Sequence, residues 1–135
     1  MTELLKYIIS YCTDLYEKFG FKIVDSVATS SFGGNGMVIL ESDEIKLKFI
    51  RDREQMFLDF LSKYDTKKNN WYSLDLIRQL LTNEQKCHSL LNKDNGHFLK
   101  NNIARIIEIY KKPNAIATLQ SLAILEKKRT KKMWG

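Results

Sequence analysis

Alternation of apolar and polar residues predicts a β-meander in the first half of the chain. Ile45, Leu47 and Phe49 alternate with lysines, which is the period of two expected for a half-buried strand. Apolar runs at residues 37–40 and 56–61 flank this strand, and short polar breaks around residues 42–44 and 52–54 separate it from them. Breaks this short predict hairpins, so we expect the runs to pair as an antiparallel meander.

Two further stretches complete the predicted sheet. Residues 21–32 have β-branched content but poor alternation, so we expect the first strand there, at the edge of the sheet. Residues 37–40 are apolar at every position, which predicts a central strand covered on both faces. The cluster Gly33-Gly34-Asn35-Gly36 lacks the Gly-Lys-Ser/Thr ending of a phosphate-binding loop, and we expect glycines at positive φ in a hairpin loop.

A 3.6-residue period predicts one helix before the meander, over residues 3–19. Thr2 is the candidate N-cap, and Gly20 is well placed as the C-terminal stop. The predicted apolar face consists of Leu4, Ile8, Cys12, Leu15 and Phe19, widened by Leu5, Ile9 and Tyr16.

Three or four helices are predicted after the meander. Ser73 is a candidate N-cap for a helix to Leu81, and the capping-box pattern at residues 82–85 predicts a short second helix to about Leu91. Residues 92–96 break the pattern. Further helices follow at 97–111 and 115–128, and Pro113 ends the first of these and suits the opening turn of the second.

These elements predict the α+β class: an N-terminal helix, a four-stranded antiparallel meander, then three to four helices packed on one face. At 135 residues the chain has the length of a single domain, residues 1–135. No apolar run approaches the length of a membrane span, and the first residues do not read as a signal peptide. We therefore expect a cytoplasmic protein with no membrane partner, in which Cys12 and Cys87 are reduced and buried.

The formal charge of +6 is concentrated in the C-terminal tail. Residues 127–135 contain five basic residues and no acidic one, whereas residues 21–65 carry eight acidic and six basic residues. The tail is open to two interpretations: a nucleic-acid or anionic-membrane contact, or a frayed helix end whose cations complement the helix dipole. We favour the helix end, and the mildly acidic sheet segment is unlike a phosphate-binding surface.

Candidate chemistry is sparse. Cys87 and His88 are adjacent, so on a helix they diverge by about 100° and do not readily share a metal ion. Nothing in the sequence orients His88 or His97 as a base for a cysteine nucleophile, and the carboxylates form no distinct constellation. Trp71 and Tyr72 are either a hydrophobic staple onto the sheet or exposed anchors of a protein interface, and we favour the staple. We expect no enzyme, no metal and no cofactor.

Residues 36–81 resemble small bacterial proteins that include the immunity proteins of contact-dependent growth inhibition and other polymorphic toxin systems. The most specific part is Arg51-Asp52-Arg53-Glu54-Gln55 followed by Phe57-Leu58-Asp59, with Trp71 to Ile77 after it. Where such proteins carry glycine before the glutamine, this chain has Glu54.

The resemblance implies a non-catalytic immunity protein that binds the C-terminal domain of a cognate toxin in the cytoplasm and occludes its active site. Charge complementarity at the interface rim would contribute. The acidic sheet segment then supplies the candidate partner-binding residues, Asp43, Glu44, Asp52, Glu54 and Asp59. The alternative is a small nucleic-acid-binding or regulatory accessory protein that uses the basic C-terminal tail.

Overall fold

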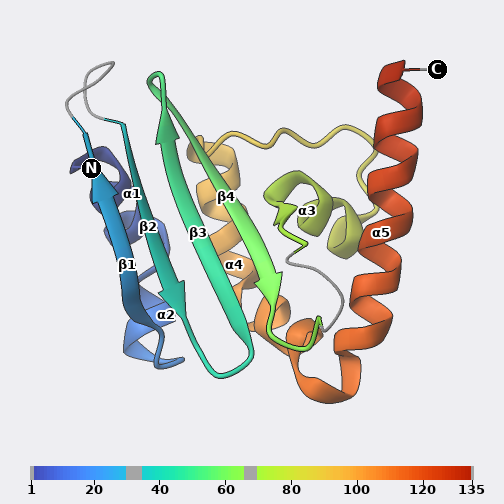
Figure 1. Ribbon diagram of the computed structural model, residues 1–135, viewed down its shortest axis with the longest axis horizontal. Helices are drawn as coiled ribbons and strands as arrows, with labels where there is room; N and C mark the ends of the chain where they lie inside the picture. The colour runs from blue at the N-terminus through green and yellow to red at the C-terminus, as the bar shows by residue number, and fades with distance from the viewer. Residues whose placement is uncertain (1, 30–34, 66–69, 135) are drawn as a thin grey trace.

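A five-stranded antiparallel sheet forms one layer of the computed structural model (Figure 1), which describes residues 2–29, 35–65 and 70–134, the side chains of 132–134 excepted. The strands lie side by side in sequence order. The predicted α+β class and the meander are confirmed, and a short fifth strand is added. The strands are β1 (Lys22–Ala28), β2 (Gly36–Glu41), β3 (Ile45–Asp52), β4 (Gln55–Ser62) and β5 (Tyr72–Ser73).

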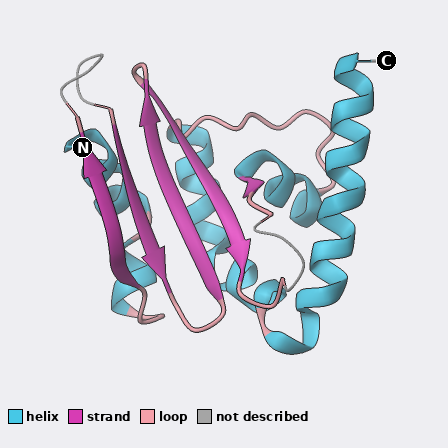
Figure 2. Ribbon diagram, in the orientation of Figure 1, coloured by secondary structure: helices cyan, strands magenta, loops and turns pink. Residues whose placement is uncertain are grey.

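The helices form a second layer (Figure 2). Helices α1, α2 and α4 lie behind the sheet, and α3 and α5 lie beyond β4, at the opposite end from β1 (Figures 1 and 2). One face of the sheet is therefore covered and the other is open. The helices are α1 (Thr2–Tyr11), α2 (Thr13–Glu17), α3 (Leu74–Thr82), α4 (Lys93–Tyr110) and α5 (Lys112–Trp134).

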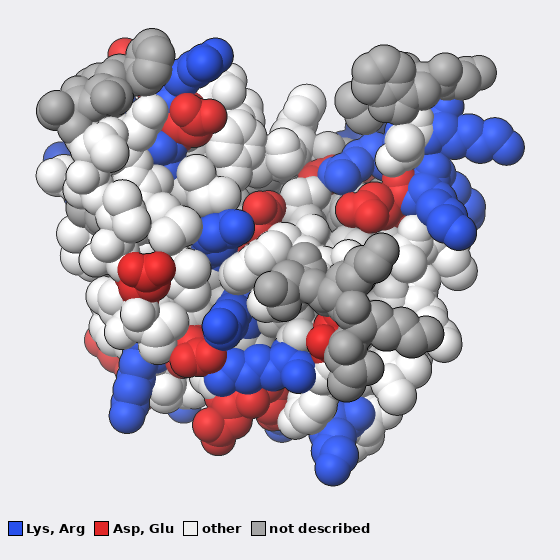
Figure 3. All heavy atoms as spheres, viewed as in Figure 1, with Lys and Arg blue, Asp and Glu red and all other residues white. Residues whose placement is uncertain are grey.

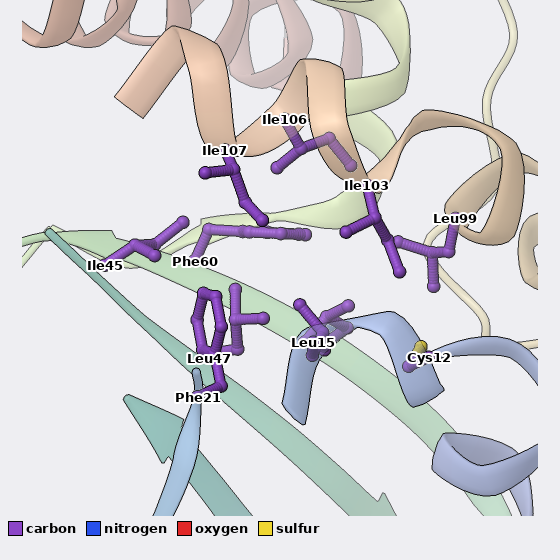
Figure 4. A pocket seen from close by; sticks show the side chains of 11 residues that line it. Cys12, Leu15, Phe21, Ile45, Leu47, Phe60, Leu99, Ile103, Ile106 and Ile107 are labelled. Atoms are coloured by element: carbon purple, nitrogen blue, oxygen red, sulfur yellow. The ribbon is translucent and has the colours of Figure 1, made fainter. Parts of the chain in front are cut away.

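Alternation along the strands sends apolar side chains into the covered face. Ile45, Leu47 and Phe49 of β3 are at most 3 % exposed, as the period of two predicts. Figure 4 shows Leu47 and Phe60 facing isoleucines of α4 across the core. The cavity among these side chains has a volume of only about 10 Å³, the lower limit for one water molecule, so this core has no room for a ligand.

The prediction that β2 is covered on both faces is wrong. Val38 and Leu40 are buried, but Met37 and Ile39 on the opposite face are half-exposed. The described helices all lie behind the sheet or beyond its β5 end (Figure 2), so the open face of β2 has no helical cover. An apolar strand sequence here does not mean two buried faces.

The single predicted helix over residues 3–19 is two helices, α1 and α2, with a break at Cys12. The predicted stripe holds for Leu4, Ile8, Cys12 and Leu15, which are buried. The predicted widening is wrong, because Tyr7 is buried on the other flank and donates its hydroxyl to the Asn92 carbonyl at 2.8 Å. Consequently Leu5, Ile9 and Tyr16 face outward, 39–63 % exposed. Gly20 ends this region at φ +69°, as expected of a helix stop.

β1 is an edge strand, as predicted, but it is shorter than the predicted 21–32. All seven of its residues are exposed, and a β-bulge interrupts its pairing with β2 between Ile23 and Asp25. The predicted positive φ of Gly33 and Gly34 falls outside the described residues. For Gly36 the prediction is wrong, because this residue begins β2 and its φ is not positive.

The predicted helix over residues 82–91 is wrong, because its capping pattern closes the previous helix. The Thr82 hydroxyl donates to the Arg78 carbonyl at 2.7 Å, and Asn83 takes the left-handed conformation at φ +60°. The chain then runs without helix to Leu91, whose N–H donates to the Met56 carbonyl of β4 at 2.8 Å.

The predicted break at residues 92–96 is also wrong, because these residues begin α4. Asn92 is the N-cap and accepts from the Asn95 N–H at 2.8 Å. The buried Asn95 amide donates to the carbonyls of His88 and Leu90 at 2.8 and 2.7 Å. The Asn95 side chain therefore holds the segment before α4 extended, although Asn95 lies ten or more residues beyond the capping pattern.

Pro113 ends α4 and lies in the first turn of α5, as predicted. Glu44, from the turn between β2 and β3, accepts the Lys112 N–H at 3.0 Å and the Tyr64 hydroxyl at 3.1 Å. A carboxylate at a helix N-terminus satisfies an otherwise unpaired N–H and favours the helix dipole. Glu44 therefore fixes the start of α5 against the sheet.

Candidate protein-binding surface

The open face of the sheet carries mixed apolar and charged side chains. Strand register places Met37, Ile50 and Phe57 side by side on this face. The next row across the strands is Ile39, Lys48, Asp59 and Ser73. All of these residues are half-exposed. Figure 3 shows this face, with acidic and basic side chains gathered between the sheet and α5.

Asp59 lies at the centre of this face. Within the described residues its half-buried carboxylate makes no hydrogen bond and no ion pair. Partial burial raises the pKa of Asp59, Lys48 and Arg129 oppose that rise, and Asp75 adds to it. Among the described residues, the fold thus holds a carboxylate that is partly stripped of water and that nearby cations stabilise only through space, without a direct hydrogen bond or ion pair.

Lys48 lies directly across from Asp59 in the β3–β4 ladder, and its ammonium packs over the Trp71 ring. Its ammonium lies 4.2 Å from the centroid of the Trp71 ring. A cation held over an indole face gains a further attraction, and here it keeps the lysine beside Asp59. Trp71 is half-buried, while the neighbouring Tyr72 is buried in the core. Trp71 is therefore placed on the open face, as the interface-anchor interpretation requires.

Asp75 is also engaged. Arg129 Nη1 lies 2.8 Å from Asp75 Oδ2 and 2.8 Å from the Ser73 Oγ, and the Ser73 hydroxyl donates to Asp75 Oδ1. Asp75 is 8 % exposed, whereas the Arg129 side chain is 38 % exposed, so the acid of this pair is buried and the cation is half-exposed. The pair joins the start of α3 to the far end of α5, so Asp75, unlike Asp59, already has a cationic partner.

The five predicted partner-binding acids do not form one surface. Asp43 and Glu44 lie at one end of the sheet and Asp52 and Glu54 at the other, separated by the length of β3. Eight strand residues at ~3.3 Å each make that separation on the order of 25 Å. Asp59 lies between them on the open face, so the structure brings none of the other four to it.

The turn at residues 53 and 54 keeps a conformation that favours glycine, although Glu54 stands where the resembling proteins have glycine. Asp52 pairs with Gln55, and Arg53 and Glu54 have φ of +50° and +70°. Two consecutive positive φ values define the two-residue turn that best fits the twist of a hairpin. The Asn35 side chain supports it by accepting the Arg53 N–H at 2.9 Å. The turn therefore keeps a conformation that favours glycine while holding Glu54.

A basic groove lies next to the open face, between α3, the extended segment before α4, and the end of α5. Its volume is about 770 Å³, and Asp75 and Arg129 lie where it meets the open face. The predicted basic tail continues α5 to Trp134. Figure 3 shows lysine and arginine side chains gathered at this end of α5. The basic side chains that line the groove are Lys86, His88, Lys128, Arg129 and Lys131.

The cysteines and histidines do not form a reactive site. Burial raises the pKa of Cys12 to about 12, and the pKa of the half-buried Cys87 is raised first by burial and then by Glu84. Both are free thiols, although the prediction that Cys87 is fully buried is wrong. His97 is exposed in α4 with its ring edge-on to Tyr11, and His88 is exposed in the groove. Within the described residues, histidine, cysteine and carboxylate side chains form no cluster that could hold a metal ion.

The helices within the described ranges lack the length and apolar character that a membrane crossing needs. Comparison of the chain with known protein families, with curated proteins and with solved structures finds no match. The site residues that sequence reasoning missed are Lys48, Ser73, Asp75 and Arg129. The period of two places Lys48 and Asp59 on one face, but no local pattern signals a contact between residues 75 and 129.

Proposed function

We propose that this chain is a non-catalytic immunity protein that binds the C-terminal domain of a cognate toxin in the cytoplasm and occludes its active site. The open face of the sheet is the binding surface in this proposal. The observation that carries it is the half-buried, internally unpaired carboxylate of Asp59 at the centre of that face.

A carboxylate in this setting favours a cationic partner. The carboxylate is already partly desolvated in the free protein. A binding arginine or lysine therefore forms a charge-assisted hydrogen bond at a lower desolvation cost. A hydrogen bond to a charged group contributes about 1.5–3 kcal/mol. Trp71 beside it supplies the large, rigid aromatic surface that is typical of interface hot spots.

The resemblance supports the same surface. Asp59 and Trp71 both belong to the stretch from residue 36 to 81 that resembles immunity proteins. Toxin active sites that act on nucleic acid are basic, and a cationic residue of such a site would fit Asp59. Occlusion requires no reactive group on this chain, so the raised thiol pKa values and the small core cavity are compatible with it.

Co-expression with the C-terminal domain of the protein encoded immediately upstream tests the proposal. We expect the domain to arrest growth alone, and this chain to restore growth and to co-purify with it at one copy per partner. A domain that is harmless alone and does not co-purify would contradict the immunity function.

The basic groove supports a second candidate, a nucleic-acid-binding accessory protein. Lys86, Lys128 and Lys131 line it and form no ion pair within the described residues. Each phosphate that such lysines neutralise adds about 0.9 to the slope of affinity against salt on a logarithmic scale. Truncation after residue 126 should then abolish a salt-sensitive affinity for RNA, whereas an unchanged affinity would exclude this function for the tail.

A further inference from the structure

Large apolar side chains are exposed mainly at one end of the molecule. Eight are exposed among the described residues, and six of them belong to α1, α2 and β1. We call these six the apolar edge: Leu5, Ile9, Tyr16, Ile23, Val24 and Val27. The other two, Ile116 and Ile124, lie apart on α5.

Part of the apolar edge, formed by Leu5, Ile9, Tyr16 and Ile23, is continuous across the helix–strand boundary. Val24 and Val27 lie farther along β1, and Val27 pairs with Met37 of the open face. A hollow of about 470 Å³ joins Leu5 and Ile9 of α1 to Ile23 of β1, and Lys22 is the one charged residue among the eight that line it. Contiguous apolar surface of this kind marks interaction sites in folded proteins. We propose that it is where a second copy of this chain binds, as a two-fold symmetric dimer.

The backbone of β1 is suited to the same contact. The Thr29 N–H donates to the Asn35 carbonyl at 2.9 Å, and alternation along an antiparallel pair then directs the N–H and C=O groups of Val27 and Asp25 toward β2. The groups of Ser26 and Ala28 consequently point away from the sheet. An edge strand with free groups of this kind is a template for another strand.

Symmetry restricts how two β1 strands can pair. A two-fold axis at Asp25 would place two carboxylates opposite each other and would use groups already bonded to β2. An axis at Ser26 places Ser26 opposite its copy and Val24 opposite Ala28, and it uses the free groups. The bulge between Ile23 and Asp25 keeps this ladder short, so the side chains of the apolar edge supply the rest of the contact.

Charge distinguishes this end as the place where a second copy can approach. Residues 2–29 carry four acidic and three basic residues, whereas residues 70–135 carry five acidic and twelve basic residues. Helix α5 lies at the opposite end of the molecule from α1 and β1 (Figure 1). Two chains joined through their β1 ends therefore keep their basic halves far apart, and the near-neutral ends meet without like-charge repulsion.

Sedimentation velocity of the full chain over a range of concentrations tests the dimer. For the wild-type chain we expect a species of twice the 15.8 kDa chain mass. For two variants we expect only the 15.8 kDa monomer. Ser26→Pro removes an outward N–H and leaves the ladder to β2 intact, because the Ser26 N–H does not face β2. Ile9→Lys with Ile23→Lys places charge on the apolar edge.

The matched control is Ile116→Lys with Ile124→Lys, which changes equally exposed isoleucines on α5 and should leave the dimer intact. A wild-type chain that stays at 15.8 kDa at every concentration would overturn the dimer. A dimer that survives both edge variants, or that the α5 control also abolishes, would overturn this interface. If Ser26→Pro fails to fold by circular dichroism, the double lysine variant decides.

Discussion

The two faces of the sheet are built from the same strands and have different tasks. On β3, Phe49 is fully buried beneath the helices, while its neighbour Lys48 lies over Trp71 on the open face. The covered face is apolar and filled, with a cavity no larger than a water molecule. The open face holds the half-buried acid Asp59, which has no hydrogen bond or ion pair among the described residues. One side of each strand therefore fixes the fold, and the other side is the surface on which we propose that the partner binds.

Adjacent residues of β3 should separate these tasks most strongly. Phe49→Ala should cost about 3–5 kcal/mol of unfolding free energy, because it empties a fully buried aromatic site. Lys48→Ala should cost less than about 1 kcal/mol, the value of a half-exposed cation–π contact. Urea denaturation of both variants measures the two changes in unfolding free energy. Equal costs would mean that the open face is as structural as the covered one.

Trp71 tests the proposed binding role of the open face. Trp71→Ala should lower affinity for the toxin domain by about 2 kcal/mol, roughly 30-fold, as expected of an aromatic hot spot. Its cost in stability should stay below about 1 kcal/mol, because the ring is half-exposed and its particular contact is with Lys48. Calorimetric titration and thermal unfolding give the two values.

The control is Ile116→Ala, which removes an exposed apolar side chain of α5 outside both the open face and the apolar edge and should leave affinity for the toxin domain unchanged. A similar loss of affinity in both variants would argue against the open face.

Glu54→Gly tests the end of the sheet. Glu54 has φ +70°, a conformation that costs a non-glycine residue about 1 kcal/mol, so glycine should raise stability by about that amount. Affinity for the toxin domain should not change, because Glu54 is remote from Asp59. A lower melting temperature would show that the Glu54 side chain contributes more than its backbone costs.

Asp59→Asn should produce the smallest stability change and the clearest functional one. Because the pKa of Asp59 is raised in the folded chain, ionised Asp59 opposes folding at neutral pH, and asparagine should add on the order of 0.5 kcal/mol. That gain should fade as pH falls through the raised folded pKa and should vanish below the ordinary aspartate value of 3.8, where aspartate is neutral in both states. Melting temperatures of both proteins between neutral pH and pH 3 measure it. A gain that grows on acidification would contradict the raised pKa.

Sequence periodicity anticipated the features that depend on near neighbours. The meander, the inward residues of β3 and the stop at Gly20 each follow from residues a few positions apart. Other features depend on distant contacts. Thr82 resembles the start of a helix but closes one, because the Asn95 amide 13 positions later holds the next segment extended.

The candidate site shows the same division. Asp59 was predicted as one acid of the mildly acidic sheet segment, and the structure places it on the open face. The other four predicted acids lie at the ends of the sheet. The sequence could not separate them from Asp59, because charge composition does not encode where along a strand a residue lies. The pair between Asp75 and Arg129 joins positions 54 residues apart, and only tertiary packing brings them together.

Growth rescue by charge-reversed variants tests the central claim most directly. Asp59→Lys and Asp52→Lys make the same chemical change on neighbouring strands, one at the centre of the open face and one at its end. Each variant would be co-expressed with the toxin domain, with folding checked by thermal unfolding. We predict that Asp59→Lys abolishes rescue and co-purification while Asp52→Lys retains both. Full rescue by a folded Asp59→Lys chain would contradict binding through the open face.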